Sequence, residues 1–207
     1  MHQGTIDLAC IATVKASLDS SGHLLRIFKQ LQELMANIII VGTGETARLC
    51  WEYFTYESKY EVRGFAIDFP HLDSGLFCGL PVYDLATLAD QHPPSETSLF
   101  IAVSSSRLNR DRADLYMRMK NEGYSFASFI SPHAYVSKTI EIGENCLILE
   151  NNTIQSGVCI GNNVFIWSGN HIGHKTIVCD HVFISSHCVI SGFSTLSEYS
   201  FLGVNCT

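Results

Sequence analysis

Two stretches of the sequence carry residue types at spacings that could do chemistry. The first is the pattern G-x-G-x-x-A over Gly42–Ala47, between a short apolar run and a segment of helical character. Its glycines allow a tight turn and a close backbone approach to a ligand, and the free N–H groups at the helix start favour a phosphate. The second is a histidine-rich zone around His174. An imidazole, with its pKa near neutrality, suits proton transfer, so we expect nucleotide binding and acid–base chemistry.

The elements around the glycine pattern predict a small α/β unit. We expect strands over 38–41, 61–67, 98–103 and 125–130, and helices over 47–56, 84–89 and 110–123. Gly42 and Gly44 lie between the first strand and the first helix. Asp68 ends the second strand, where an acidic residue can bind a ribose or a base edge. A tight turn without a ligand is the alternative interpretation of this pattern.

From residue 134 onward the sequence repeats every six positions. Branched aliphatic residues recur without a break, at Val136, Ile142, Ile148, Ile154, Ile160, Ile166, Ile172, Val178, Ile184, Ile190, Leu196 and Leu202. This repeat is typical of a β-helix, in which each short strand points one aliphatic residue inward and three strands make one coil. Residues eighteen apart then stack about 4.8 Å apart. We therefore expect three interior ladders of aliphatic side chains.

Composition excludes several classes of function. The chain has 207 residues, a net charge of −7 and 16% charged residues, which suits a soluble globular protein. A basic patch is missing, which disfavours a nucleic-acid partner, and no apolar run reaches the roughly 20 residues of a membrane span. The eight cysteines form no CxxC pair, so we expect them to pack in the core of a protein of the reducing cytoplasm.

A small nucleotide-binding type of unit followed by hexapeptide repeats resembles the NeuD/PglD group of sugar acyltransferases. The resemblance covers residues 36–207 and rests on two motifs, over 38–47 and over Trp167–Val178. It implies a Rossmann-like N-terminal domain followed by a left-handed parallel β-helix. It also implies acetyl transfer from acetyl-CoA to a nucleotide-linked amino sugar, at a site between the subunits of a homotrimer.

The resemblance also assigns roles to single residues. His174 becomes the general base that takes the proton of the acceptor amine. The backbone at Gly192 contacts the pantetheine arm of acetyl-CoA. The residues that bind the acceptor are Gly42, Gly44, Asp68, Asn170 and Ser185. For Asn170, Ser185 and Gly192, the alternative is a structural role in the turns and asparagine ladders of a β-helix.

The sequence departs from the family at the residue after the base. A carboxylate or polar partner often follows the catalytic histidine there, whereas this chain has Lys175. A cation cannot accept the ring N–H, so we expect another group to orient His174, with Asp180 and Glu150 as candidates.

Two further classes of function stay open. The gamma-type carbonic anhydrases share the β-helix and hold zinc with three histidines. Because we find no arrangement that matches that ligand set, we expect no metal. Within the resemblance, O-acetylation of a sialic acid is the alternative reaction. From another class, the chain could be a non-catalytic module for nucleotide-sugar binding or assembly.

These arguments predict three segments of the chain. Residues 1–34 are expected to be an N-terminal extension, with a docking helix as the alternative. Residues 35–130 form the Rossmann-like domain and residues 131–207 the β-helix. The sequence stops partway through a coil, and Lys138 and Lys175 are the only Lys or Arg residues from position 134 onward. We therefore expect a fragment with a weakened CoA site.

Overall fold

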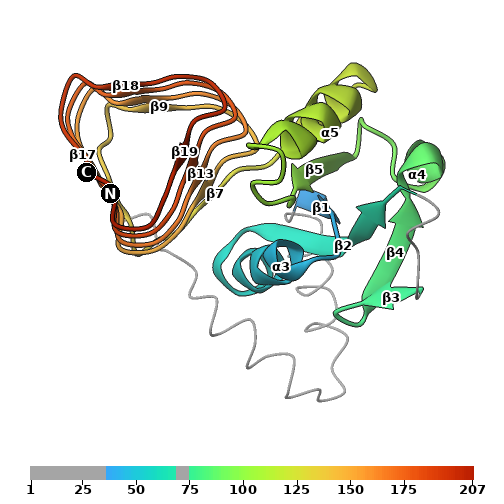
Figure 1. Ribbon diagram of the computed structural model, residues 1–207. Coiled ribbons are helices and arrows are strands. Elements are labelled where there is room, and N and C mark those ends of the chain that lie inside the picture. Colours follow the sequence, from blue (N-terminus) through green and yellow to red (C-terminus); the bar gives the residue numbers. More distant parts are fainter. Residues whose placement is uncertain (1–35, 69–74) are drawn as a thin grey trace, which may run out of the picture.

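The computed structural model describes residues 36–68 and 75–207. The predicted N-terminal extension, 1–34, lies outside these residues. Two units follow each other in the described part, an open α/β sheet and a three-sided β-helix, and they lie side by side (Figure 1).

The α/β unit is a six-stranded sheet in the order β3-β4-β2-β1-β5-β6. Its strands are β1 (Ala36–Val41), β2 (Tyr60–Ile67), β3 (Leu76–Phe77), β4 (Leu80–Asp84), β5 (Thr97–Ile101) and β6 (Ser125–Phe126). All pairs are parallel except β3 with β4. The side chains of Ile38–Val41 are at most 1% exposed, as expected for a parallel strand covered on both faces.

Helices connect these strands where the sequence predicted them. They are α3 (Glu45–Glu57), the 3-10 turn η1 (Leu85–Thr87), α4 (Leu88–Gln91) and α5 (Arg110–Asn121). The predicted strands at 38–41, 61–67 and 98–103 are confirmed, with small differences at their ends. The single strand expected over 125–130 was wrong. It divides into β6, which extends the open sheet, and β7 (Phe129–Ile130), which begins the β-helix.

Three parallel sheets, each made of two-residue strands, form the β-helix. The first contains β7, β10 (Leu147–Ile148), β13 (Phe165–Ile166), β16 (Phe183–Ile184) and β19 (Phe201–Leu202). The second contains β8 (Tyr135–Val136), β11 (Thr153–Ile154), β14 (His171–Ile172) and β17 (Val189–Ile190). The third contains β9 (Glu141–Ile142), β12 (Cys159–Ile160), β15 (Ile177–Val178) and β18 (Thr195–Leu196). The repeat fits a left-handed β-helix.

The inward ladders confirm the predicted coil of eighteen residues. Ile148 pairs with Ile166 and Ile166 with Ile184, and the other two sheets repeat this register. The aliphatic side chains form one interior cluster together with Cys146 and Cys188, both of which are fully buried. Burial of this ladder is the main stabilising contribution of the repeat.

A left-handed backbone recurs every sixth residue because each corner of the coil turns there. Within the β-helix, the residues with φ between 54° and 79° are Asn145, Asn151, Gly157, Asn163, Gly169, Lys175, His181, His187, Phe193, Tyr199 and Asn205. Asparagine and glycine adopt this region easily, whereas other residues bear a cost of about 1 kcal/mol each. The later coils therefore carry costs at Lys175, Phe193 and Tyr199 that the earlier coils avoid.

The first sheet of the β-helix packs against the α/β unit, as Figure 1 shows for β7, β13 and β19. The ring of Phe100 in β5 stacks on Phe165 of β13, with ring centroids 5.7 Å apart and planes 8° apart. Phe54 of α3 contacts both Phe100 and Phe129, at centroid distances of 5.0 and 5.7 Å. One hydrophobic cluster thus spans both units, so they pack as a single body.

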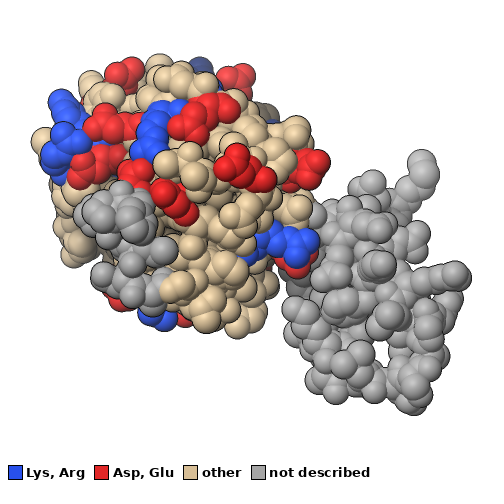
Figure 2. All heavy atoms as spheres, turned by 90° about the vertical axis from the view of Figure 1, so that its right-hand side faces the viewer, with Lys and Arg blue, Asp and Glu red and all other residues tan. Residues whose placement is uncertain are grey.

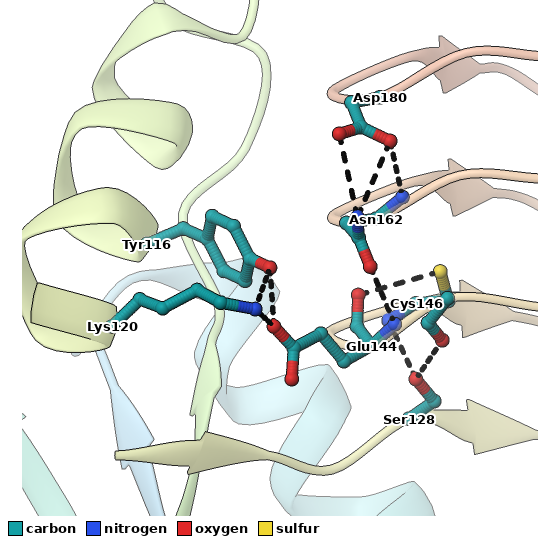
Figure 3. Close-up of polar contacts among 8 residues, drawn as sticks. Tyr116, Lys120, Ser128, Glu144, Cys146, Asn162 and Asp180 are labelled. Carbon is teal, nitrogen blue, oxygen red and sulfur yellow. Dashed lines mark hydrogen bonds and ion pairs between the residues drawn. The ribbon is translucent and has the colours of Figure 1, made fainter. Parts of the chain in front are cut away.

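Polar contacts join the same two units at one corner of the β-helix. Lys120 and Tyr116 of α5 both contact the carboxylate of Glu144, while Asn162 and Asp180 lie on the next two coils (Figure 3). Beside them, the buried side chains of Asn145, Asn163 and His181 form a ladder one coil apart.

The hydrogen bonds of this ladder require a neutral His181. The side-chain oxygen of Asn163 accepts from Asn145 Nδ2 at 2.7 Å and from Arg112 Nε at 3.1 Å, so the amide is oriented with Nδ2 toward His181. Nδ1 of His181 accepts that Nδ2–H at 2.9 Å and cannot carry a proton of its own. Burial, and secondarily the Arg112 cation, lowers the pKa of His181, against the opposing charges of Asp180 and Glu198.

Stability should therefore fall on the acid side. Because the folded chain binds the His181 proton less readily than the unfolded chain, the unfolded state takes up more protons below pH about 6.5. Asparagine at position 181 is expected to keep the ladder and the left-handed corner. We therefore expect the urea midpoint of His181→Asn to fall less steeply with falling pH than that of the wild type. The measurement is the urea midpoint between pH 8 and pH 5.

The matched control is His187→Asn, another left-handed corner histidine, whose side chain is exposed. Its acid-side slope should equal that of the wild type. Equal slopes for both variants would contradict the role assigned to His181.

Candidate functional site

His174 lies at the corner between β14 and β15, and its side chain is exposed. It directly precedes Lys175, the residue in the left-handed region at this corner. The neighbouring coils place Phe193 and Gly192 beside it. The corner faces away from the α/β unit, on the side between β17 and β18 in Figure 1.

Two residues determine the orientation of the His174 ring. The side-chain oxygen of Gln155 accepts the backbone N–H of His174 at 2.9 Å and lies 3.3 Å from Nδ1 of the ring. Phe193 packs edge-to-face against the imidazole, with ring centroids 4.9 Å apart. A carbonyl oxygen can only accept, so the proton on Nδ1 points to Gln155 and the lone pair is on Nε2.

Asp180 and Glu150 were wrong as orienting groups. Asp180 accepts from the backbone N–H of Asn162 at 2.7 Å, at the corner shown in Figure 3. Glu150 accepts from Tyr53 and Ser168, both at 2.6 Å, at the third corner. Asp180 follows His174 by six residues and Glu150 precedes it by twenty-four, so neither spacing returns to the corner of His174.

Gly192 lies directly against the imidazole. A Cβ added there would stand 2.8 Å from Cε1 and Nδ1 of His174 and 2.9 Å from its carbonyl oxygen. Only a glycine allows the next coil to approach the ring this closely. The space that a side chain would take at Gly192 is therefore filled by the ring and backbone of His174.

Asn170 and Ser185 lie elsewhere in the coil. Asn170 is 2% exposed and points into the β-helix, where it accepts from Cys188 N at 2.7 Å and donates to the carbonyl of Trp167. Its backbone N–H is bonded to the side chain of Asn152, so it belongs to an interior asparagine ladder. Ser185 is 9% exposed and follows β16 on the side of the α/β unit. Within one chain, neither residue contacts His174.

The glycine pattern forms a tight turn at the carboxyl end of β1. Gly42 has φ 124°, and a Cβ there would lie 3.2 Å from the carbonyl oxygen of Ala102, so this position requires glycine. Gly44 precedes α3, and nothing lies within 4 Å of an added Cβ. The first turn of α3 thus has open space beside its backbone, as a phosphate would need.

Asp68 already has a partner in this structure. Its carboxylate accepts from Arg118 of α5 at 2.7 Å, and both side chains are partly exposed. A ribose that binds Asp68 would therefore compete with a surface ion pair, which is a weak interaction.

The two groups of predicted residues lie apart in one chain. Gly42, Gly44 and Asp68 surround the carboxyl ends of β1 and β2, whereas His174 lies at the corner of the β-helix that faces away from that sheet (Figure 1). A reaction that uses both groups needs a second copy of the chain to bring them together.

The remaining histidines of the zone do not gather around a common point. His171 lies on the outer face of β14, while His181 and His187 occupy the other two corners. Among the described residues, no group of three His, Cys, Asp or Glu side chains could hold a metal ion.

The surface of the α/β unit mixes both signs of charge. Figure 2 shows acidic and basic side chains interspersed on the face turned away from the β-helix. Ion pairs such as Arg107 with Asp111 and Arg118 with Asp68 account for part of this pattern. Within residues 36–68 and 75–207, no helix is long and apolar enough to cross a membrane.

Sequence reasoning missed Gln155 and Phe193. Gln155 precedes His174 by nineteen residues and Phe193 follows it by nineteen, which is one coil plus one position in each case. The coil length was known from the repeat, so this spacing could have identified both.

Part of the chain matches a known family of repeats. Residues 157–192 match the family described as bacterial transferase hexapeptide (six repeats). A relative, the acyl-[acyl-carrier-protein]–UDP-N-acetylglucosamine O-acyltransferase of Sinorhizobium fredii, is 28% identical over 78 residues, which are 34% of this chain and 29% of the relative. The chain thus spans less than a third of that relative's length.

Solved acetyltransferases share the fold. The acetyltransferase domain of PglB from Neisseria gonorrhoeae, in complex with acetyl coenzyme A, has a TM-score of 0.72 at 20% identity, over 83% of this chain and 80% of that chain. A mutant of the GDP-perosamine N-acetyl transferase from Caulobacter crescentus, in complex with CoA and GDP-perosamine, has a TM-score of 0.56 at 19% identity, over 82% and 93%. The comparisons confirm the resemblance predicted from the sequence.

Proposed function

We propose that the chain transfers an acetyl group from acetyl-CoA to the amine of a nucleotide-linked sugar, with His174 as general base. The observation that carries this proposal is the exposed imidazole whose Nδ1 faces Gln155, which leaves Nε2 free to accept a proton. The named ligands of the two similar structures, acetyl coenzyme A and GDP-perosamine, support the choice of donor and acceptor.

The reaction is a direct transfer without a covalent enzyme intermediate. The acceptor nitrogen attacks the thioester carbonyl, the new C–N bond forms and the C–S bond breaks. Nε2 of His174 takes the proton that the nitrogen loses and returns it to the CoA thiolate. Gln155 stabilises the imidazolium formed in between, because its oxygen accepts the Nδ1–H throughout.

Gly192 is the proposed contact for the donor. The His174 ring occupies the space beside its Cα, so a pantetheine arm that follows the Gly192 backbone would run next to the imidazole. The thioester carbon would thereby lie next to the base.

The α/β unit is the proposed Rossmann-like binding domain for the nucleotide. The turn at Gly42, the open first turn of α3 after Gly44, and Asp68 would hold the phosphates and the ribose. Asn170 and Ser185 do not contact His174 within one chain, so the acceptor role proposed for them would need a site formed between subunits.

We also propose a homotrimer with the site between subunits. The sheets that meet at the His174 corner expose apolar side chains on their outer faces, with Tyr135 at 66%, Val189 at 49% and Ile177 at 48% exposure. An adjacent subunit that covers these residues would also exclude water from His174 and supply the distant acceptor domain. A cytoplasmic location, where acetyl-CoA is available, belongs to the same proposal.

Calorimetry with separate ligands tests the two binding sites. Wild-type protein and His174→Ala should each bind acetyl-CoA, and each should bind one of UDP, GDP and dTDP. A chain that binds acetyl-CoA and no nucleotide would contradict the nucleotide-linked acceptor. A chain that binds nucleotide and no acetyl-CoA would favour a non-catalytic nucleotide-sugar module, and acetyl transfer to sialic acid hydroxyls would favour the O-acetyltransferase alternative.

A further inference from the structure

Arg112 is a fully buried cation between the two units. It belongs to the first turns of α5, its exposure is 0%, and none of the described carboxylates forms an ion pair with it. Burial lowers its pKa to about 9, so the surroundings oppose the charge that the guanidinium carries. The hydrogen bonds of the guanidinium must therefore account for an arginine at this buried position.

One side of the guanidinium holds the carboxyl end of β5. Nη1 donates to the carbonyl of Ser104 at 3.0 Å and lies 3.4 Å from the carbonyl of Val103. These residues directly follow the strand beside the Gly42 turn, since Ala102 donates to Val41 and its carbonyl faces Gly42. Arg112 thus fixes the backbone where the proposed nucleotide site lies.

The other side of the guanidinium holds the β-helix. Nε donates to the side-chain oxygen of Asn163 at 3.1 Å, and Nη2 donates to the carbonyls of Asn163 and Val182 at 3.3 and 3.4 Å. The planar group also stacks over the ring of Phe165, 4.2 Å from its centroid. Two successive coils are therefore tied to the end of β5 by one side chain.

A second contact binds the same loop to the next coil. Arg107, Leu108 and Asn109 all have positive φ, and this left-handed turn joins β5 to α5. The buried Asn109 donates from Nδ2 to the carbonyls of Ser200 and Tyr199, at 3.2 and 3.4 Å. Strained loops persist where neighbouring contacts hold them, and such loops concentrate at binding sites.

A purely structural role would not need an arginine. A buried hydrophobic residue of similar volume fills such an interface at least as well as an uncompensated charge. What arginine adds is a rigid fork of donors that points to both units at once, and a lysine or methionine cannot reproduce that fork.

We propose that Arg112 is a positioning residue that holds the acceptor-binding end of β5 in a fixed place relative to the β-helix, and so aligns the acceptor nitrogen with the transfer site. The inference rests on the proposed function. Misplacement of a reacting group by about 1 Å can lower a rate about 100-fold, so small movements of this strand end matter.

Kinetics with two acceptors test the positioning. We expect Arg112→Lys and Arg112→Met to lower kcat for a nucleotide-linked amine about 10- to 100-fold, with the dissociation constants of nucleotide and acetyl-CoA changed less than about twofold. Transfer to a small amine without a nucleotide should keep its wild-type rate, because that acceptor does not use the α/β unit. Arg110→Met is the matched control, since Arg110 begins the same helix with an exposed side chain over Tyr199.

Amide hydrogen exchange supplies a readout that does not depend on activity. In both Arg112 variants, residues 101–109 should exchange faster than in the wild type and in Arg110→Met, while the coils around Ile148 stay protected. Unchanged exchange of this loop would overturn the proposal. Equal rate losses on both acceptors would overturn it as well, because they indicate general damage.

A different result would contradict the proposed function. A wild-type chain that acetylates no nucleotide-linked amine contradicts the proposed function itself, and the Arg112 effect on hydrogen exchange would then report a structural contact alone. A wild-type chain that is active on both acceptors, with Arg112 variants that lose neither rate, contradicts only the positioning role.

Discussion

Replacing His174 by alanine is expected to lower kcat for acetyl transfer about 100- to 10,000-fold, which is the usual contribution of a positioned general base. The side chain is exposed and belongs to no buried ladder, so the fold should persist. Nucleotide affinity should stay unchanged, because the glycine turn lies at the far side of the chain. The measurement combines steady-state kinetics with the urea midpoint of the same preparation.

His187→Ala is the control for His174→Ala. It removes another exposed histidine, which itself has a left-handed backbone and lies at the corner that carries Glu150 and Ser168. Its activity should remain within about twofold of the wild type, in line with a surface substitution. If both variants keep full activity, His174 is not the base and the proposed mechanism is wrong.

Replacing Asn163 by alanine is expected to destabilise the chain by about 3 kcal/mol or more, since three buried partners lose a hydrogen bond together. Its side chain accepts from Arg112 and Asn145 and donates to His181. The loss is large because one of these partners is a buried cation, and alanine must also adopt the left-handed backbone of the corner. The measurement is the free energy of unfolding from urea titration at pH 8.

Asn151→Ala is the matched control for this stability change. Asn151 has φ 58° at the equivalent position of another corner, and its side chain is exposed. It therefore reports the backbone cost alone, which we expect near 1 kcal/mol. Similar losses in both variants would mean that the contacts of Asn163 with Arg112 and His181 contribute little.

The two units differ in how far the local sequence pattern determines their structure. In the β-helix, each strand, ladder and corner follows from the six-residue repeat, because every residue contacts neighbours at a constant sequence separation. The position of His174 at an exposed corner followed from counting within that repeat. The same counting would have excluded Asp180 and Glu150 and found Gln155, had it been applied to whole coils.

In the α/β unit, the alternation of apolar runs with helical segments was enough to predict most of the strands and helices. The strand expected over 125–130 was wrong because β6 and β7 are both apolar and nearly adjacent, and only their hydrogen-bond partners tell which sheet each joins. Asp68 likewise follows its strand as expected, while its ion pair with Arg118 could not be seen in the local pattern.

The sequence by itself determined the hexapeptide coil, the glycine turn at Gly42 and the corner histidine, because each of these depends on residues close together in the chain or at a fixed period. Only the tertiary structure decided how the two units join. A charged residue on α5 would ordinarily be assigned to the solvent side, yet Arg112 is buried against residues 51 and 70 positions away. Contacts at such separations follow no period, so packing between the units, and not the local pattern, determines where these side chains lie.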